Sequence, residues 1–462
     1  MTGYEKIKQL AKEHKTNIPN LLALAKQNDP FFSGSPANKN QAEWFYGLWQ
    51  DFGYITGIHL RRFHYQLVSQ KEAKKHDGKP YQNTVNDWNY LCMAGKYARH
   101  LGLIEPDAFI DRRNPEPHIF REEDGVYDRP SWGHDFYDWE LPSIETELSR
   151  NLDWELPGIY SSGYNYHKNL QPYHLELWAE KSTMDDVLIP LCQRYSVNLV
   201  TGLGFMSITS VIDLLKRVCS SAKPCRIFYI SDFDPAGDGM PTAVARQIEY
   251  YLTSYAPEAN IKLNPVVLTR EQVITYHLPR IPIKENDKRK GGFEDRYGEG
   301  AVELDALEAL HRGQLAKIIK RNITPYIDEE LAERIARVRR EAEKKLDAWW
   351  KENIAPYQQE LDELKKDVND ILEKYQEQLE SLNEELQFNL GPWENSKETL
   401  RQAVQKKLNE YRPNLPDLPE PETKPTEDGW LYDSSRDYFD QLANYKKRKQ
   451  GEKDNVPARE NT

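Results

Sequence analysis

Apolar residues recur every three or four positions in the first part of the chain. This spacing predicts amphipathic helices over residues 4–27, 41–52, 60–69 and 88–101. Polar residues suited to capping precede the last of these helices, and Gly102 follows it. Several short helices in succession are typical of a helix-turn-helix or winged-helix module. We therefore expect residues 1–122 to form a helical, winged-helix-like domain that binds DNA.

The pattern changes to alternating strands and helices at residue 174. Runs of β-branched and aromatic residues predict strands over 174–179, 197–201, 226–231 and 264–268. Helical spacing predicts intervening helices over 183–195, 207–221 and 238–253. Such alternation favours a parallel sheet with helices on its faces. The sequence thus predicts a doubly wound α/β domain over residues 173–325.

A leucine-spaced pattern follows the α/β domain. Leucines and other apolar residues separated by three and four positions predict a coiled-coil helix over 357–389, bounded by Pro356 and by Gly391-Pro392. It lies within a helical region that we place at 326–411. Whether this helix pairs with a second chain or folds back within one chain stays open. The expected fold class is α/β plus α.

Two further segments lack periodicity. Residues 123–172 are rich in Trp, Tyr, Pro and Asp, which is typical of an acidic linker packed by its own aromatic residues. Residues 412–462 are rich in Pro, Glu and Lys, so we expect a largely flexible tail with one aromatic patch over 430–445. The 462 residues and 54.1 kDa agree with such a multidomain chain.

Charge excludes one class of DNA-binding protein. Lys and Arg number 62 against 74 Asp and Glu, so the net charge of −12 does not allow the whole chain to coat nucleic acid, and any DNA contact must be local. The longest apolar runs are far shorter than a membrane span. The four cysteines show no C-x-x-C spacing and are expected to be buried, reduced thiols. We expect a soluble, cytoplasmic, nucleoid-associated protein with no membrane contact.

The most specific motif is Asp232-Phe233-Asp234-Pro235-Ala236-Gly237-Asp238, which directly follows a predicted strand. In an open α/β sheet, ligands bind at the carboxyl ends of the strands. Clustered carboxylates need a cation, and hard oxygen ligands suit Mg²⁺ or Mn²⁺. Asp-x-Asp also occurs in phosphotransferases, sugar transferases and ordinary turns. A second predicted strand ends at Glu180, and a glycine turn at 201–205 lies between the two carboxylate segments.

This arrangement of strand–Glu, glycine turn and strand–Asp-x-Asp-Pro-x-Gly resembles the Toprim domain of topoisomerases, primases and some nucleases. The resemblance covers about residues 173–255 and is greatest to the A subunit of topoisomerase VI and the related meiotic double-strand-break transesterase. It implies that Glu180, Asp232 and Asp234 hold Mg²⁺, with Asp238 as a helper, and that Glu180 is catalytic. In the segment 301–307, Glu303 or Asp305 either approaches the metal or caps a helix.

The same family carries a nucleophilic tyrosine ahead of its Toprim domain. Residues 60–68 resemble that helix, because Arg61 precedes Tyr65 by four positions. The resemblance implies that Tyr65 attacks DNA with help from Arg61, Arg62 or His64. The sequence has Arg62 where the family usually has Asp, and His64 where it has an aromatic residue. The alternative is that Tyr65 packs in the core of an amphipathic helix.

Basic residues near this helix are candidates for binding DNA phosphates. We expect this role for Arg62, Lys74, Lys75, Arg99, Arg112 and Arg113. The alternative is that the lysines lie in a solvated loop.

The resemblance implies a homodimer that cuts double-stranded DNA by tyrosine transesterification. The chain has no phosphate-binding loop motif, so an ATPase would be a separate subunit. One rival is a Toprim nuclease that hydrolyses DNA with a metal-activated water, as in phage and plasmid defence. The other is a DNA-binding scaffold without catalysis.

Overall fold

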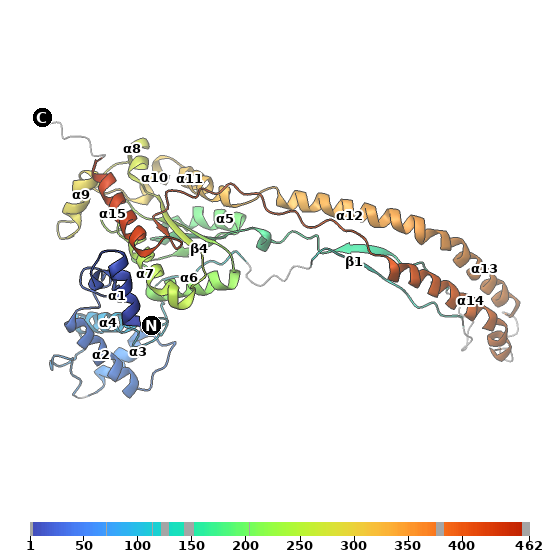
Figure 1. Ribbon diagram of the computed structural model, residues 1–462, viewed down its shortest axis with the longest axis horizontal. Helices are drawn as coiled ribbons and strands as arrows, with labels where there is room; N and C mark the ends of the chain where they lie inside the picture. The colour runs from blue at the N-terminus through green and yellow to red at the C-terminus, as the bar shows by residue number, and fades with distance from the viewer. Residues whose placement is uncertain are drawn as a thin grey trace. The chain divides into compact units, whose positions relative to one another are not determined.

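The chain forms two compact units in the computed structural model (Figure 1). The structure describes residues 3–70, 72–112, 114–121, 129–142, 152–202, 204–375 and 383–454. The first unit comprises Met1–Asp124, Gln171–Ile327 and Thr423–Thr462, and the second comprises Gly125–Leu170 and Asp328–Glu422. Both units are therefore discontinuous in sequence, unlike the consecutive domains that we expected.

The first unit opens with the expected helices. They are α1 (Gly3–Glu13), the 3₁₀ helix η1 (Ile18–Leu21), α2 (Pro36–Asp51), α3 (Leu60–Val68) and α4 (Val85–His100). The first is shorter than predicted, and α4 begins after Thr84, whose side chain accepts a hydrogen bond from Asp87 N. Phe45, Phe63 and Leu91 are fully buried between these helices. The described residues of 3–121 contain no β-strand, and a β-hairpin wing is absent from them. The loop between α3 and α4 has an isolated antiparallel bridge between Lys74 and Pro80.

A five-stranded sheet forms the centre of the first unit. Its strands are β3 (His174–Ala179), β4 (Asn198–Thr201), β5 (Cys225–Ile230), β6 (Ile261–Val267) and β7 (Tyr432–Asp433), in the order β4-β3-β5-β6-β7. The first four are parallel, which confirms the predicted parallel sheet, and β7 is antiparallel to β6. Every residue of β3, β4 and β5 is buried, as in parallel sheets covered on both faces.

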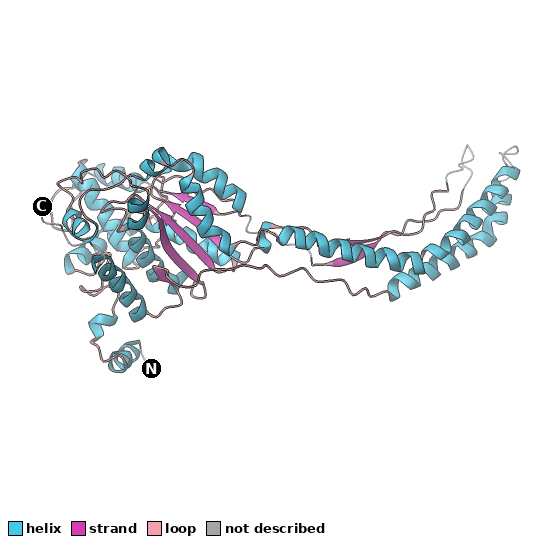
Figure 2. Cartoon of the chain, turned by 90° about the horizontal axis from the view of Figure 1, so that it is seen from above, coloured by secondary structure: helices cyan, strands magenta, loops and turns pink. Residues whose placement is uncertain are grey.

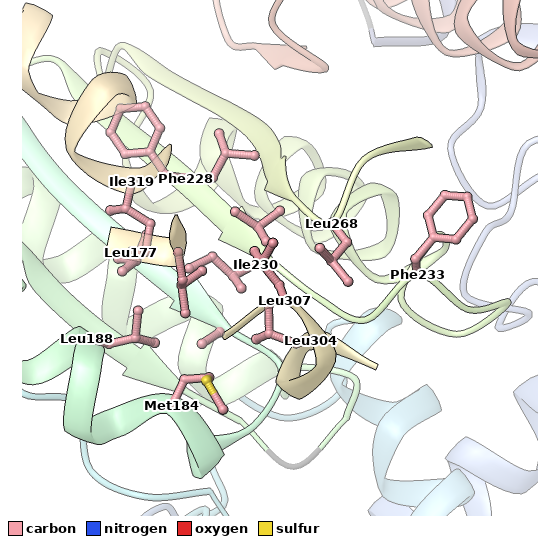
Figure 3. Packing of buried hydrophobic residues seen from close by; sticks show 14 of the residues in the cluster. Leu177, Met184, Leu188, Phe228, Ile230, Phe233, Leu268, Leu304, Leu307 and Ile319 are labelled. Carbon is pink, nitrogen blue, oxygen red and sulfur yellow. The ribbon is translucent and has the colours of Figure 1, made fainter. Parts of the chain in front are cut away.

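Helices pack on both faces of this sheet (Figure 2). One face is covered by α5 (Asp185–Tyr195), α10 (Leu304–Leu310) and α11 (Gln314–Ile323), and the other by α6 (Ile208–Ser221) and α7 (Met240–Tyr255). Figure 3 shows the first face, where Leu177 and Ile230 of the sheet lie with Leu188, Leu307 and Ile319 of the helices. The remaining elements are η3 (Ser182–Met184), α8 (Arg270–Thr275), α9 (Lys290–Tyr297), η4 (Thr324–Tyr326) and α15 (Tyr438–Asp454).

Part of the expected flexible tail belongs to the core of the first unit. Leu263 of β6 pairs with Tyr432 of β7, and Tyr432 is 2% exposed. Trp430 and Leu431 are also buried, and Tyr445 of α15 packs in the same cluster as Tyr432. The sequence set this aromatic patch apart from the flexible tail, but it did not indicate that the patch adds a strand to the sheet.

The second unit combines the aromatic connector with the C-terminal helices. Its elements are β1 (Ser131–His134), β2 (Ile159–Ser162), η2 (Lys168–Leu170), α12 (Leu331–Asn353), η5 (Ala355–Tyr357), α13 (Gln358–Tyr375) and α14 (Asn383–Glu410), and β1 and β2 are antiparallel. Trp139 and Trp154 share one hydrophobic cluster with Leu361 of α13 and Leu390 of α14. The connector therefore packs on the helices rather than only on itself.

The leucine-spaced face finds its partner within the chain. Leu361, Leu364, Val368 and Leu372 of α13 are buried, and α13 lies beside α14 (Figures 1 and 2). Pro392 lies inside α14, so the expectation that Gly391-Pro392 ends the helical segment is wrong.

Two further expectations concern cysteines and membranes. The four cysteines form no disulfide, but Cys219 is exposed and Cys92 is half-buried, so the expectation of buried thiols holds only for Cys192 and Cys225. Among the described helices, none is long and apolar enough to cross a membrane.

Candidate functional site

The turn after β5 depends on its glycine and its second aspartate. A Cβ atom on Gly237 would lie 2.1 Å from the carbonyl oxygen of Asp232, so no other residue fits without a backbone shift. Asp234 Oδ1 accepts hydrogen bonds from Ala236 N at 2.8 Å and Gly237 N at 2.6 Å. Ser231 Oγ donates to Gly237 O at 3.1 Å. The Asp-x-Asp-Pro-x-Gly sequence thus folds the chain back at the carboxyl edge of the sheet.

Glu180 and Asp232 meet at this edge. Glu180 N donates to Ile230 O at 3.0 Å, which continues the pairing of β3 with β5 by one residue. Asp232 N donates to Glu180 Oε2 at 3.1 Å. Asp232 Oδ1 accepts a hydrogen bond from Leu304 N at 2.7 Å, at the start of α10. The parallel register therefore brings together the two carboxylate segments, as the strand order predicted.

Lys181 joins the carboxylates to a segment from farther along the chain. Its Nζ atom lies 2.9 Å from Asp232 Oδ2, 2.5 Å from Glu303 Oε2 and 3.2 Å from Asp305 Oδ2. Paired backbone hydrogen bonds between Phe233 and Val302 hold that segment beside the turn. Glu303 and Asp305 therefore approach the cluster through an ammonium group. The side chain of Glu303 makes no cap at the start of α10.

Burial and crowding of negative charge shift the acidity of the cluster. Burial, followed by the charges of Asp232 and Asp234, raises the pKa of Glu180 to about 7. Burial also raises the pKa of Asp232, against hydrogen bonds from Leu304 N and Lys181. Burial alone would lower the pKa of Lys181, but its hydrogen bonds to Glu303 and Asp232 raise this pKa above its usual range. Glu180 is thus the acid whose negative charge is balanced least by hydrogen bonds and positive charge in this cluster.

Asp238 and Arg289 have roles that the sequence did not indicate. Asp238 accepts hydrogen bonds from Arg296 Nη2 at 2.6 Å and from the Tyr297 hydroxyl at 2.9 Å. Each of its oxygens therefore accepts one hydrogen bond from α9, and the expected role of Asp238 as a helper of the metal site stays a prediction. A hydrogen bond to Asp287, with smaller effects of Asp234 and Glu180, raises the pKa of Arg289. Arg289 is thus paired mainly with Asp287, to which its Nε and Nη2 atoms donate at 3.0 and 2.9 Å.

The chemistry of the donors fits a divalent cation at Glu180 and Asp232. Both offer hard carboxylate oxygens, and a lysine ammonium already lies among the neighbouring carboxylates. Among the residues that the structure describes, however, no group of three or more His, Cys, Asp or Glu side chains is arranged to hold a metal ion. A third carboxylate ligand would have to come from Asp234 or from a carboxylate now held by Lys181, whereas water completes the coordination of Mg²⁺ held by two carboxylates.

Tyr65 lies on the surface of α3. Its side chain is 59% exposed, whereas Phe63, His64 and Leu67 of the same helix are buried. The alternative that Tyr65 packs in the core is therefore wrong. Among the described residues, no contact joins Tyr65 to Glu180, Asp232 or Asp234 of the same chain.

The candidate helpers of Tyr65 differ in availability. Arg61 and Arg62 are exposed beside it. His64 is buried, and its ring nitrogens bond the Tyr81 hydroxyl at 2.7 Å and Asn83 Oδ1 at 3.1 Å. His64 therefore fixes α3 to the following loop and is not free to assist Tyr65.

The candidate phosphate-binding residues fall into two groups. Lys74 and Arg112 are exposed, but Lys75 Nζ pairs with Asp87 Oδ1 at 2.7 Å. Arg99 Nη1 donates to Pro106 O at 3.3 Å and to Thr209 Oγ1 at 3.5 Å, and burial lowers the pKa of Arg99 to about 10. Lys75 and Arg99 thus support packing, contrary to expectation. Arg113 lies outside the described residues.

Comparison of the sequence with protein-family models and with curated proteins gives no match. The fold and site define an α/β protein with a mostly parallel sheet and an acidic, lysine-bridged cluster at the carboxyl edge of that sheet.

Proposed function

We propose that the protein cleaves DNA strands in a reaction that depends on Mg²⁺ or Mn²⁺. The observation that supports this most is the meeting of Glu180 and Asp232 at the carboxyl edge of β3 and β5, beside Asp234. A metal held there would bind phosphate oxygens and stabilise negative charge that develops at the scissile phosphate. Arg289, at the start of α9 and paired with Asp287, would add a smaller favourable charge.

Tyr65 is the proposed nucleophile. Its phenol oxygen would bond to phosphorus as the bond from phosphorus to a deoxyribose oxygen breaks. The phenol proton would pass to solvent, and the departing oxygen would take up a proton, so the phosphotyrosyl bond replaces the phosphodiester bond. Exposure of Tyr65 and the adjacent Arg61 support this role. Arg61 would stabilise the phenolate that attacks.

We further propose that the reaction uses two copies of the chain on double-stranded DNA. Tyr65 has no described contact with the carboxylate cluster of its own chain, so a tyrosine from one copy would act with the cluster of another. Two such pairs would make two cuts in the duplex. A separate ATPase subunit would be needed for passage of a second duplex.

Hydrolysis by water is the second candidate function. It is favoured by the same meeting of Glu180 and Asp232, because a metal held there would activate a water to attack phosphorus. In this case Tyr65 would take no part, and the products would carry no protein.

Supercoiled plasmid with Mg²⁺ or Mn²⁺, quenched in detergent and analysed with and without protease, separates these functions. Transesterification predicts protein-linked linear DNA that is lost in both Tyr65→Phe and Glu180→Gln. The matched controls are Tyr137→Phe, a similarly exposed tyrosine at 60%, and Glu258→Gln, an exposed glutamate. Protein-free cuts that persist in Tyr65→Phe but not in Glu180→Gln would instead support hydrolysis. An absence of cutting by every form would contradict both functions and favour a DNA-binding scaffold.

A further inference from the structure

Helix α4 buries one face and exposes another. Leu91 and Ala94 are fully buried in the core of the helical part of the first unit. Asn86, Asn89 and Met93 recur at intervals of three and four residues and are exposed, so they share a face that points away from this core. In the described part of the chain, neither asparagine side chain forms a hydrogen bond with another residue. Both amide groups are therefore available to a partner.

The part of the chain that contains α4 is basic. Residues 52–101 contain eight Lys and Arg against three Asp and Glu, a net charge of +5 in a chain whose total is −12. The one acidic residue in the sequence of α4, Asp87, is buried and pairs with Lys75 at 2.7 Å, so it adds no negative charge to the exposed face. Arg61 and Arg62 are exposed on the preceding helix, α3. This distribution of charge is complementary to a nucleic-acid backbone.

A buried histidine joins the start of α4 to α3. The ring nitrogens of His64 in α3 bond the Tyr81 hydroxyl at 2.7 Å and Asn83 Oδ1 at 3.1 Å, in the loop that leads to α4. The His64 ring also lies edge-to-face with the Trp88 ring of α4, with 5.3 Å between the ring centroids. The first turns of α4 are thus fixed relative to the exposed arginines of α3, and both helices can contact one duplex together.

The exposed residues at the start of α4 match the edges of A·T base pairs. In the major groove, an asparagine amide accepts a hydrogen bond from N6 of adenine and donates one to N7, and an apolar side chain contacts the methyl group of thymine. In helix-turn-helix proteins, the first residues of one helix make such contacts. Asn86 and Asn89 lie in the first two turns of α4, and Val85 beside them is 75% exposed. We infer that α4 enters the major groove and reads adenine with Asn86 and Asn89, an inference that rests on the proposed function because it gives the same DNA substrate a sequence preference.

Selection of sequences from a random duplex pool by the full-length protein in EDTA tests this inference. EDTA prevents metal-dependent cutting, so binding is measured whether or not the protein cleaves DNA. The variant is Asn86→Ala/Asn89→Ala, and its matched control, Asn369→Ala/Asn409→Ala, replaces two exposed asparagines of α13 and α14. Fluorescence anisotropy then measures binding to the selected duplex with adenine or with 7-deazaadenine, which lacks the N7 acceptor. This base substitution tests the wild type itself and does not depend on the folding of a variant.

We expect the wild type and the control to select one site that contains adenine, and 7-deazaadenine to weaken wild-type binding to that site about tenfold. Asn86→Ala/Asn89→Ala should lose the preference for these adenines and keep its affinity for unrelated duplexes, because the arginines of α3 remain. Binding without selection, selection of the same adenines by the variant, or equal binding of 7-deazaadenine would overturn this inference and leave the proposed function standing. A wild type that binds no duplex would overturn both.

Discussion

Gly237 lies where the chain leaves no room for a side chain. A Cβ atom there would meet the Asp232 carbonyl oxygen at 2.1 Å, so Gly237→Ala forces the backbone of the turn to move. We expect a loss of about 2 kcal/mol or more in the free energy of unfolding, measured with urea. Gly291→Ala in α9 is the control, because nothing lies within 4 Å of its added Cβ. Equal stability of the two variants would contradict the assigned turn geometry.

Glu180 should make the protein less stable as the pH rises. Its pKa is about 7 in the folded protein against 4.5 ordinarily, so between these values the folded state binds more protons than the unfolded chain. The free energy of unfolding therefore falls across that interval and stays low above it. In EDTA, we expect the wild type to lose more stability than Glu180→Gln between about pH 5 and about pH 8. Parallel pH profiles for the two proteins would rule out this shift.

The sequence predicted some site residues because strand ends are visible in it. Glu180 and Asp232 follow apolar runs, and parallel strands bring such ends together. Lys181 was not recognised, although it directly follows Glu180, because its partners Glu303 and Asp305 are more than a hundred positions away. The partner of Arg99 at Thr209 is likewise distant in sequence, whereas Lys75 pairs with Asp87 only twelve positions away, a pairing that charge pattern alone did not single out.

Strand β3 and helix α6 are joined by a buried ion pair. Glu176 is fully buried and accepts hydrogen bonds from Arg217 Nε at 2.8 Å, His174 Nε2 at 2.9 Å and Trp178 Nε1 at 2.7 Å. The positive charge of Arg217 and these hydrogen bonds outweigh burial and keep the pKa of Glu176 below its usual range.

Removal of Arg217 should therefore be costly. Arg217→Met leaves the Glu176 charge without its cation, and we expect a loss of about 3–5 kcal/mol in the free energy of unfolding. Glu176→Gln/Arg217→Met removes both charges and should lose less. Thermal and urea unfolding of both variants measure the difference, and a double variant as unstable as Arg217→Met would show that the charge is not the cause.

Helices and strands with long, regular patterns of apolar residues were predicted better than short strands without such a pattern. The strands over 174–179 and 226–231 were found within one residue, because buried parallel strands are continuous apolar runs. Strand β7 has only two residues, Tyr432 and Asp433, so it has no periodicity to detect. The leucine spacing of α13 correctly indicated a buried face, but spacing alone does not identify the partner helix.

The whole molecule carries a net charge of −12, so proposed DNA binding must rest on local cations. Arg61→Met/Arg62→Met should weaken binding to a duplex oligonucleotide and reduce the slope of log K against log salt by about 2, since each lost phosphate contact contributes about 0.9. Fluorescence anisotropy over a salt series measures both quantities. Arg339→Met/Arg340→Met on α12 removes an equal charge from another exposed pair. An unchanged slope in the first variant would place the DNA contacts elsewhere.

The order of units along the chain was not predictable from composition. Residues 125–170 and 328–422 build the second unit, although their compositions differ and the α/β segment lies between them. Amino-acid composition shows where one kind of segment gives way to another along the sequence. It does not show which apolar faces, distant in sequence, pack together in one core. Trp139 and Leu361 belong to one cluster for that reason.

The position of β7 has a consequence during protein synthesis. Strand β6 pairs with β7 at Lys262 and Leu263, so the outer edge of the sheet stays unpaired at these residues until residue 433 has left the ribosome. A nascent chain that stops earlier presents unpaired amide and carbonyl groups of β6, which other strands can join. Release of a chain cut short ahead of Tyr432 would therefore favour aggregation, even though the four parallel strands are all present.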